Sequence, residues 1–368
     1  VREYLLIAVI AMAVTYAATP LVRALAVVFG AVTPLRDRDV HRVPIPRLGG
    51  VAIFLGFAAA TLIARELPYL KGVYASGQMT GVLLGAAIVV AVGALDDIRE
   101  LDWWAKLAGQ VLAAGVMAYK GVVLLSVPFF GTSTVLPGPV LVAVTVFVVL
   151  ATTNAVNFID GLDGLAAGIV AIASFAFFVY SYVLSHTYDP PNVFSTATFV
   201  TAATLGCCLG FLPHNFNPAR LFMGDSGALL LGLLLAAATI SLTGSVDPSS
   251  VSGDQLTAAL LPILAPLAVL SLPFLDMLLA VLRRTRAGQR PWQPDAKHLH
   301  HRMLAIGHGH RGAVLILYLW AAVLALGTVS LAFFRGWLTV VAILVATVVA
   351  AVCTAYLPRW FPPKAPKP

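Results

Sequence analysis

Charged side chains are scarce in this sequence: Asp, Glu, Lys and Arg make up 11% of its 368 residues, against about 25% in an ordinary soluble protein. Hydrophobic residues reach 60%, and the mean hydropathy is +0.93. A water-exposed globule of this composition would have too little polar surface to cover itself, and a disordered chain would carry far less apolar material. The sequence therefore predicts an integral membrane protein.

Cysteine is also rare, with three residues in the whole chain. Cys207 and Cys208 are adjacent inside one apolar run, and Cys353 lies in another. This number excludes a secreted scaffold held together by disulfides, and the positions give no information on the redox compartment.

Apolar runs close to the length of about 20 residues that a helix needs to cross a bilayer predict eleven transmembrane helices. They are expected to form an all-α polytopic fold, with one catalytic domain over 1–357 and a flexible cytoplasmic tail over 358–368. Between two spans, the stretch from Ser126 to Pro139 is compatible with a small outer hairpin. The predicted spans are 3–22, 48–64, 80–95, 104–120, 139–156, 162–184, 195–212, 227–243, 257–282, 313–334 and 337–357.

The distribution of basic residues predicts the orientation of these spans, because Lys and Arg concentrate in cytoplasmic loops. With the N-terminus outside and the C-terminus in the cytoplasm, 18 of the 23 Lys and Arg residues fall on the inner side. The net charge of +7 is thus a topology signal, and no nucleic-acid partner is expected. The basic residues left outside are Arg2, Arg65, Lys71, Lys120 and Arg335.

Acidic residues gather at the cytoplasmic ends of several predicted spans. Asp96 and Asp97 follow an apolar run, Asp160 and Asp163 lie in a very short connection, and Asp225 opens another span. Acids so close to hydrocarbon are costly unless they are paired, bound to metal or in a wet cavity. Ordinary solvated positions are expected for Asp37, Asp39, Glu100 and Asp102.

The converging acids predict a Mg²⁺ site, in which Mn²⁺ can substitute. Adjacent carboxylates repel each other, and a divalent cation or a raised pKa relieves that repulsion. Mg²⁺ prefers oxygen ligands and often works with substrate phosphates, whereas a structural zinc site would require cysteines that these loops lack.

The cytoplasmic loop 283–312 is the longest inner loop and the most basic. An anchor on anionic lipid headgroups accounts for its first basic residues, Arg283, Arg284 and Arg286. It does not account for the histidine cluster next to Lys297, which is better suited to holding phosphate oxygens. We expect His308 and His310 to be plain loop residues. The predicted phosphate-binding group is His298, His300, His301 and Arg302.

Acids, a divalent cation and basic groups at the inner headgroup level suit phosphoryl transfer between a cytosolic substrate and a lipid. A secondary transporter is the alternative from a different class. Its ionisable residues should lie near the bilayer midplane, where only Asp276 is found. An internal pair or a partner at a helix bend is the preferred interpretation for that residue.

The sequence resembles the polyprenyl-phosphate N-acetylhexosamine-1-phosphate transferases, a superfamily of the glycosyltransferase family 4 type, over essentially its whole length. Eleven spans with an outside N-terminus are also typical of that family, which often forms homodimers. The motifs that carry the resemblance are Pro46 to Gly50, Asp96-Asp97, Asn154 to Gly164, Asn215 to Gly227 and His298 to His301.

The resemblance implies that a lipid phosphate attacks the β-phosphorus of a UDP-sugar and releases UMP. Asp225 would bind Mg²⁺, and Asp96, with Asp97 beside it, would deprotonate or orient the lipid phosphate. The catalytic residues implied in this way are Asp96, Asp97, Asp225, His300 and His301, and the substrate-binding residues are Arg42, Asn157, Asp160, Asp163, Asn215, Phe222, His298 and Arg302. Phe222 would stack on uracil, although an aromatic at this position is equally compatible with packing.

Departures from the lipid I branch favour UDP-GlcNAc as the donor. That branch carries three consecutive histidines and a lysine soon after its Asp-Asp pair, where this chain has His298-Leu299-His300-His301 and Ile98-Arg99-Glu100. The pattern is similar to the branch that starts lipopolysaccharide O-antigen, teichoic acid or arabinogalactan linker synthesis at the cytoplasmic face of the bacterial plasma membrane. Transfer of phospho-MurNAc-pentapeptide remains the alternative.

Overall fold

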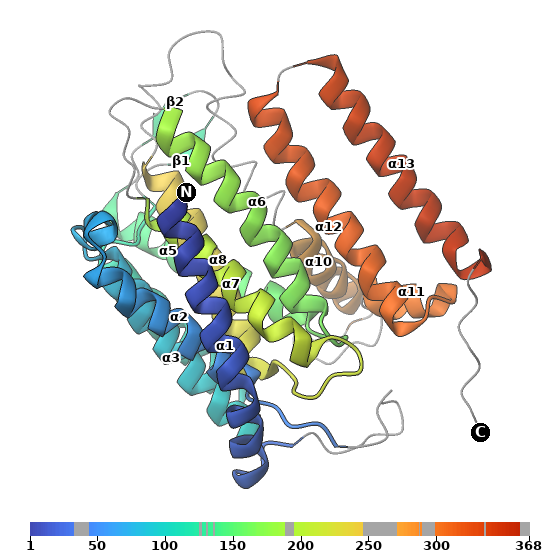
Figure 1. Ribbon diagram of the computed structural model, residues 1–368, viewed down its shortest axis with the longest axis horizontal. Helices are drawn as coiled ribbons and strands as arrows, with labels where there is room; N and C mark the ends of the chain where they lie inside the picture. The colour runs from blue at the N-terminus through green and yellow to red at the C-terminus, as the bar shows by residue number, and fades with distance from the viewer. Residues whose placement is uncertain are drawn as a thin grey trace.

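The computed structural model describes residues 1–32, 44–124, 127–129, 132–134, 137–187, 195–245, 271–286, 288, 299–334 and 336–360. These residues are almost entirely helical, as the sequence predicted (Figure 1). The elements of the first half are α1 Arg2–Val28, α2 Gly49–Glu66, the 3₁₀ helix η1 Pro68–Tyr74, α3 Gln78–Arg99, α4 Trp103–Tyr119, β1 Val127–Phe129, β2 Thr132–Thr134 and α5 Gly138–Ile159. Those of the second half are α6 Leu165–Thr187, α7 Thr196–Asn215, α8 Gly224–Ser245, α10 Ser271–Arg286, α11 Leu299–Ile306, α12 His310–Phe333 and α13 Trp337–Trp360.

Nine of the described helices are long and apolar enough to cross a membrane, and each coincides with a predicted span. They are α1, α2, α3, α5, α6, α7, α8, α12 and α13. The predicted span 104–120 corresponds to α4, which has 17 residues and is shorter than the usual crossing length. Only the later part of the predicted span 257–282 is described, as α10, so the total of eleven stays a prediction.

Helix ends differ from the predicted ends in ways that matter for the site. α3 continues to Arg99, so that Asp96 and Asp97 lie in its last turn instead of in the following loop. α13 continues to Trp360, a short way into the predicted tail, and residues 361–368 lie outside the described part. The acids are therefore fixed by helical backbone.

Several buried hydroxyl groups within the spans donate to carbonyls of their own helices. Thr61 donates to the carbonyl of Phe57 at 2.8 Å, and Thr204 donates to that of Val200 at 2.7 Å. Such bonds to the carbonyl one turn earlier let polar residues lie in an apolar interior at small cost.

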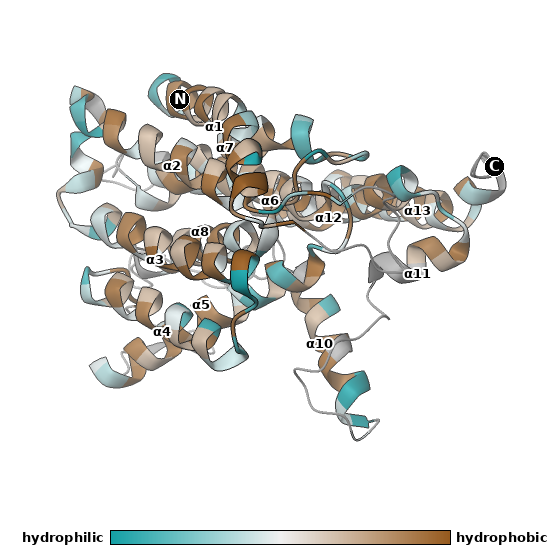
Figure 2. Cartoon of the chain, turned by 90° about the horizontal axis from the view of Figure 1, so that it is seen from below, coloured by the Kyte–Doolittle hydropathy of each residue, from teal (hydrophilic) through white to brown (hydrophobic). Residues whose placement is uncertain are grey.

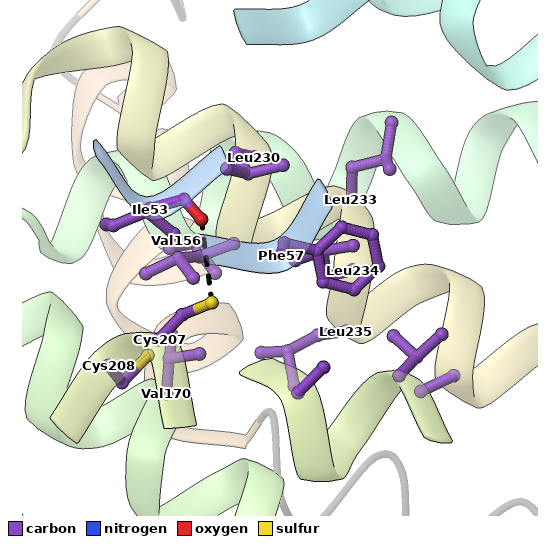
Figure 3. Packing of buried hydrophobic residues seen from close by; sticks show 14 of the residues in the cluster. Ile53, Phe57, Val156, Val170, Cys207, Cys208, Leu230, Leu233, Leu234 and Leu235 are labelled. Carbon is purple, nitrogen blue, oxygen red and sulfur yellow. Dashed lines mark hydrogen bonds between the residues drawn. The ribbon is translucent and has the colours of Figure 1, made fainter. Parts of the chain in front are cut away.

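The central helix of the bundle is α8, which packs against α2, α3, α5 and α7. Phe57 of α2 and Val156 of α5 lie in the same buried cluster as Leu234 of α8 (Figure 3). The thiol of Cys207 also lies in this core and donates to the carbonyl of Ile53 at 3.5 Å. This packed core makes α8 a rigid support for Asp225, which lies in its first turn.

The bundle is apolar on its outside as well. Large side chains such as Leu112, Phe147 and Leu344 are 59%, 68% and 58% exposed, as expected for surfaces that face lipid. Figure 2 shows the hydrophilic segments mainly toward helix ends and the hydrophobic ones along the helices. The chain is a multi-pass membrane protein.

The hairpin expected between Ser126 and Pro139 is present. β1 and β2 pair antiparallel, with Val127 opposite Thr134 and Phe129 opposite Thr132. In Figure 1 the hairpin lies at the end of the bundle where α5 begins, opposite the end where α3 finishes and α8 starts. We call the latter the site end, because it carries the acids discussed next.

Candidate active site

The two adjacent acids at the end of α3 have different partners. Asp97 accepts hydrogen bonds from the backbone N–H groups of Asp225 and Ser226, at 2.9 and 3.2 Å, and from the Ser226 hydroxyl at 2.8 Å. It thereby caps the N-terminus of α8, where a negative charge also interacts favourably with the helix dipole. Gly224 has a φ of +70°, and a Cβ there would lie 2.3 Å from Asp97 Oδ2. The Asp97 carboxylate is thus committed to placing Asp225.

Asp96 faces a different group, the ammonium of Lys106 in the first turn of α4. Lys106 Nζ lies 2.6 Å from Asp96 Oδ2 and 2.8 Å from Asp225 Oδ2, so it bridges the two carboxylates. The side chain of Asn157 lies beside the Asp225 carboxyl. The side chains of Lys106 and Asp225 are 30% and 27% exposed, which leaves this cluster accessible from the aqueous side. Lys106, Asp96, Asp225 and Asn157 form what we call the acid–lysine cluster.

Lys106 was not predicted as a site residue. It was counted only as one of the basic charges on the inner side. Its position offered a signal, because a lone lysine in the first turn of an otherwise apolar helix needs a partner close to hydrocarbon. The partner could not be identified, since Asp225 is far away in the sequence.

Glycines allow the predicted motifs to lie against one another. A Cβ on Gly50 would be 2.1 Å from the backbone nitrogen of Gly227, and one on Gly93 would be 2.4 Å from Ser226 Cα. The start of α2 and the segment before α8 also share backbone hydrogen bonds. These run from Phe222 N–H to Pro46 O, from Gly49 N–H to Phe222 O and from Gly50 N–H to Met223 O, at 2.9, 3.0 and 3.0 Å.

The loop between α5 and α6 is tied to the loop between α7 and α8. Asp163 Oδ2 accepts from the Asn217 side chain and the Ala219 N–H, both at 3.0 Å. Asn215 accepts from the Gly164 N–H and donates to the Leu221 carbonyl, also at 3.0 Å. Asp163 and Asn215 are buried. Asp163 and Asn215, both predicted to contact substrate, therefore hold together the two loops that border the acid–lysine cluster.

The start of α12 joins the same loops. His310 Nε2 accepts from the Asp163 N–H at 3.1 Å, Arg311 Nε donates to the Asn217 carbonyl at 2.9 Å, and the Tyr318 hydroxyl donates to the Gly164 carbonyl at 2.5 Å. His308 is buried, and its Nε2 lies 2.9 Å from the Thr354 carbonyl of α13. His308 lies in the loop between α11 and α12, as expected, whereas His310 is the first residue of α12, and both make tertiary contacts.

The remaining basic residues of the predicted site are only partly described. His300, His301 and Arg302 lie on the short helix α11, which packs against α12 and α13. Arg42 and His298 lie outside the described residues. Their predicted phosphate and sugar contacts stay predictions.

Arg284 differs from its expected role as a headgroup anchor. It is 3% exposed, and its guanidinium lies 5.3 Å from the ring centre of Phe158 on α5. A cation over an aromatic face is stabilised most where water is excluded. Arg284 therefore fastens the end of α10 to the part of α5 that carries Asn157.

Asp160, in the loop between α5 and α6, is a further acid at the site end. Burial, together with the charges of Asp225, Asp97 and Asp163, raises the pKa of Asp160 to about 7, although Arg47 opposes this rise. A carboxyl whose pKa is raised by burial and by neighbouring carboxylates is often found at functional sites.

The residues present fit a divalent cation that is completed by substrate oxygens. Among the described residues, no group of three or more His, Cys, Asp or Glu side chains meets in metal-binding geometry. Mg²⁺ commonly takes only one or two carboxylates together with waters and substrate phosphates. Asp225 and Asn157 supply oxygens of that type, and the ammonium of Lys106 shows that a cation is accommodated beside Asp225.

Comparison with known proteins places these residues in a family. Residues 79–243, which run from the first turn of α3 to the last turn of α8, match the glycosyl transferase family 4. The chain is 43% identical over 357 residues to the decaprenyl-phosphate N-acetylglucosaminephosphotransferase of Mycolicibacterium smegmatis, covering 96% of this chain and 88% of the relative. The chain belongs to glycosyl transferase family 4.

Other relatives match over similar lengths. The chain is 30% identical to the undecaprenyl-phosphate alpha-N-acetylglucosaminyl 1-phosphate transferase of Yersinia pestis, over 90% of this chain and 86% of the relative. It is 34% identical to the phospho-N-acetylmuramoyl-pentapeptide-transferase of Desulforudis audaxviator, over 81% of this chain and 87% of the relative. The resemblance inferred from five short motifs is thus confirmed across the chain.

Proposed function

We propose that the protein transfers GlcNAc-1-phosphate from UDP-GlcNAc to a polyprenyl phosphate. The products would be UMP and polyprenyl-diphosphate-GlcNAc, the first lipid-linked intermediate of a cell-envelope polysaccharide. The observation that carries the proposal is the acid–lysine cluster, in which Lys106 links Asp96 and Asp225 at distances of 2.6 and 2.8 Å. The names of the GlcNAc-transferring relatives support the choice of sugar.

In this reaction an oxygen of the lipid phosphate forms a bond to the β-phosphorus, and the bond from that phosphorus to the bridging oxygen breaks. Asp96 orients the attacking phosphate and takes its proton where one is present. Lys106 neutralises charge on the phosphate oxygens, which is the main requirement of phosphoryl transfer. For the lysine to reach them, substrate oxygens replace part of its pairing with the carboxylates.

Mg²⁺ belongs to the proposal as the cofactor. Asp225 would hold it with help from Asn157, and it would neutralise charge on the diphosphate. Asp97 and the glycines around Gly224 keep Asp225 in place for this purpose. The acids and the basic loop 283–312 would face the cytoplasm of a bacterial plasma membrane, where UDP-sugars are available.

The test compares two donors with purified protein in detergent. UMP release is measured with UDP-GlcNAc and with UDP-MurNAc-pentapeptide, each with and without a polyprenyl phosphate. We expect release only with UDP-GlcNAc and lipid together, and loss of activity with EDTA. Release from the pentapeptide donor would instead favour the lipid I reaction, and sugar movement across proteoliposomes without UMP would favour a transporter.

Three variants sharpen this test. Asp225→Ala and Lys106→Met should each lower kcat by at least about a hundredfold, because each removes charge stabilisation that is needed in the transition state. Asp102→Ala is the matched control, since Asp102 is an exposed acid at the same end and caps no helix with its side chain. Full activity of Asp225→Ala would overturn the metal assignment.

A further inference from the structure

A polar junction lies one helical turn deeper in the bundle than the acid–lysine cluster. Gln110 of α4 is 3% exposed and sits among spans with an apolar core. Its Oε1 accepts from the Asn154 side-chain amide at 2.7 Å and lies 3.1 Å from the Thr153 hydroxyl, both on α5. A buried amide without such partners is costly, so this contact joins α4 to α5 at a defined register.

Asn154 is the more directed of the two partners. Its amide donates one hydrogen to Gln110 and the other to the Leu150 carbonyl at 2.7 Å. The Thr153 hydroxyl has a single hydrogen, and the carbonyls of Val149 and Leu150 also lie within 2.9 and 3.0 Å of it. The bond from Asn154 to Gln110 is therefore the main link between the helices.

The junction lies on the same helix faces as the acid–lysine cluster. On α4, Lys106 precedes Gln110 by four positions, and on α5, Asn157 follows Asn154 by three, and such spacings place side chains on one face. Both cluster residues meet Asp225 at the start of α8. α8 is held against the junction as well, because a Cβ on Gly232 would lie 2.5 Å from Thr153 Cα.

We propose that Gln110 is a positioning residue for the transfer reaction, acting through Lys106. Lysine has a long, flexible side chain whose ordering carries an entropic cost. The register set by Gln110 and Asn154 places the base of that side chain so that Nζ reaches both Asp96 and Asp225. The inference rests on the proposed function for its kinetic consequence, while its structural consequence, the placement of Lys106, is independent of the substrate.

The test uses Gln110→Leu, which removes the Oε1 acceptor and puts an apolar side chain of similar size in its place. We expect kcat for UDP-GlcNAc to fall by about tenfold or more, with a much smaller change in KM, as for misplaced catalytic groups. We also expect Lys106 to react several-fold faster with a water-soluble acetylating reagent, measured by mass spectrometry. That second readout does not depend on any enzyme activity.

Two further variants separate positioning from stability. Gln110→Leu alone leaves the Asn154 amide without its acceptor and should lower the thermal unfolding temperature. Gln110→Leu combined with Asn154→Leu removes both groups of that bond, so the unfolding temperature should return toward the wild-type value. In this double variant kcat should stay low, and Lys106 acetylation should stay fast. Thr145→Val is the matched control at the other end of α5, where the Thr145 hydroxyl accepts from the Leu124 N–H at 3.1 Å. It should lower the unfolding temperature and leave kcat and Lys106 acetylation within about twofold of wild type.

Two results would overturn the inference. One is a Gln110→Leu protein whose kcat and Lys106 acetylation stay within about twofold of wild type. The other is a double variant in which kcat recovers together with the unfolding temperature, since that would reduce the junction to a stability element. If the wild-type protein released no UMP, the proposed function would fail, and the acetylation rates would still decide the placement of Lys106.

Discussion

At the scale of single residues, the neighbouring carboxylates of Asp96 and Asp97 have different roles at the site end. Asp97 accepts three hydrogen bonds from the first residues of α8, whereas Asp96 pairs with Lys106. Helix geometry explains the division, because consecutive positions point about 100° apart on α3. An Asp-Asp motif in a sequence therefore does not reveal which acid is available for chemistry.

Replacing Asp97 by Asn should show its capping role. The new amide group would turn N–H donors toward those of α8, so we expect a loss of at least about 1 kcal/mol in the free energy of unfolding. kcat should fall as well, because loss of the Asp97 bonds would displace Asp225. The measurements are thermal unfolding in detergent and UMP release. Asp102→Asn is the control, since Asp102 precedes α4 without a side-chain capping bond. Equal behaviour of the two variants would contradict the capping role.

The raised pKa of Asp160 predicts how stability depends on pH. Without metal, the pKa of Asp160 is about 7 in the folded protein, compared with the ordinary value of 3.8 expected for the unfolded chain. The folded state thus binds the proton more tightly, and this contribution to stability is present below about pH 4 and is lost as the pH rises through 7. The Asp160→Asn side chain does not titrate, so the variant does not lose this stability as the pH rises.

Thermal unfolding of wild type and Asp160→Asn in EDTA tests this expectation. The variant should gain in unfolding temperature relative to wild type as the pH is raised from 5 to 8. A difference that shrinks over this range would show that the carboxylate is favoured in the fold. Asp102→Asn, at an exposed position, should show no such trend.

At the scale of elements, close helix approach depends on glycines at particular contacts. Gly50 of α2 meets the backbone of Gly227 in α8, and a methyl group there would lie 2.1 Å from the nitrogen. Gly50→Ala should therefore push the two helices apart, at a cost of about 1–3 kcal/mol for overpacking, and should lower kcat by shifting Asp225.

Gly115→Ala is the control for this prediction. Gly115 lies in α4 with nothing within 4 Å of an added Cβ, so alanine there should be neutral or stabilise the helix by up to about 1 kcal/mol. Unfolding temperatures of the two variants check the contrast. Equal unfolding temperatures of the two variants would show that the contact between α2 and α8 tolerates a methyl group.

Most elements were predictable from the sequence because hydrophobic length alone defines a membrane span. Nine predicted spans and the hairpin match described elements. The ends of α3 and α13 were less predictable, since helices continue past the apolar run into polar residues. Composition does not record where backbone hydrogen bonding stops.

At the scale of the whole molecule, the motifs were predictable and their contacts were not. The sequence indicated that Asp96, Asp97 and Asp225 meet at one end, which the structure confirms. Lys106 was missed as a site residue, because it pairs with an acid contributed by a distant helix. Arg284 was assigned to the headgroups for the same reason, since its partner Phe158 is also remote in the sequence. Tertiary pairing across the bundle decides these roles, and a linear pattern does not contain it.

The orientation of the whole chain gives the last prediction. Lys71 in η1 and Asp102 before α4 are both exposed, and α3 separates them, so they should lie on opposite sides of the membrane. The bias of basic residues places Asp102 in the cytoplasm, together with the acid–lysine cluster. Lys71→Cys should then react with a membrane-impermeant maleimide in intact cells, and Asp102→Cys only in inverted vesicles.

The native thiols make this labelling clean. Cys207 and Cys208 are buried, and Cys353, which is only partly buried in α13, is replaced by Ser in every variant, including the control without an added cysteine. Reaction of Asp102→Cys in intact cells, with protection of Lys71→Cys, would invert the topology. The acid–lysine cluster would then face away from cytosolic UDP-GlcNAc, and the proposed reaction could not use that donor. Labelling of both positions from the same side would mean that α3 does not cross the membrane, which its 22 residues and apolar core make physically unfavourable.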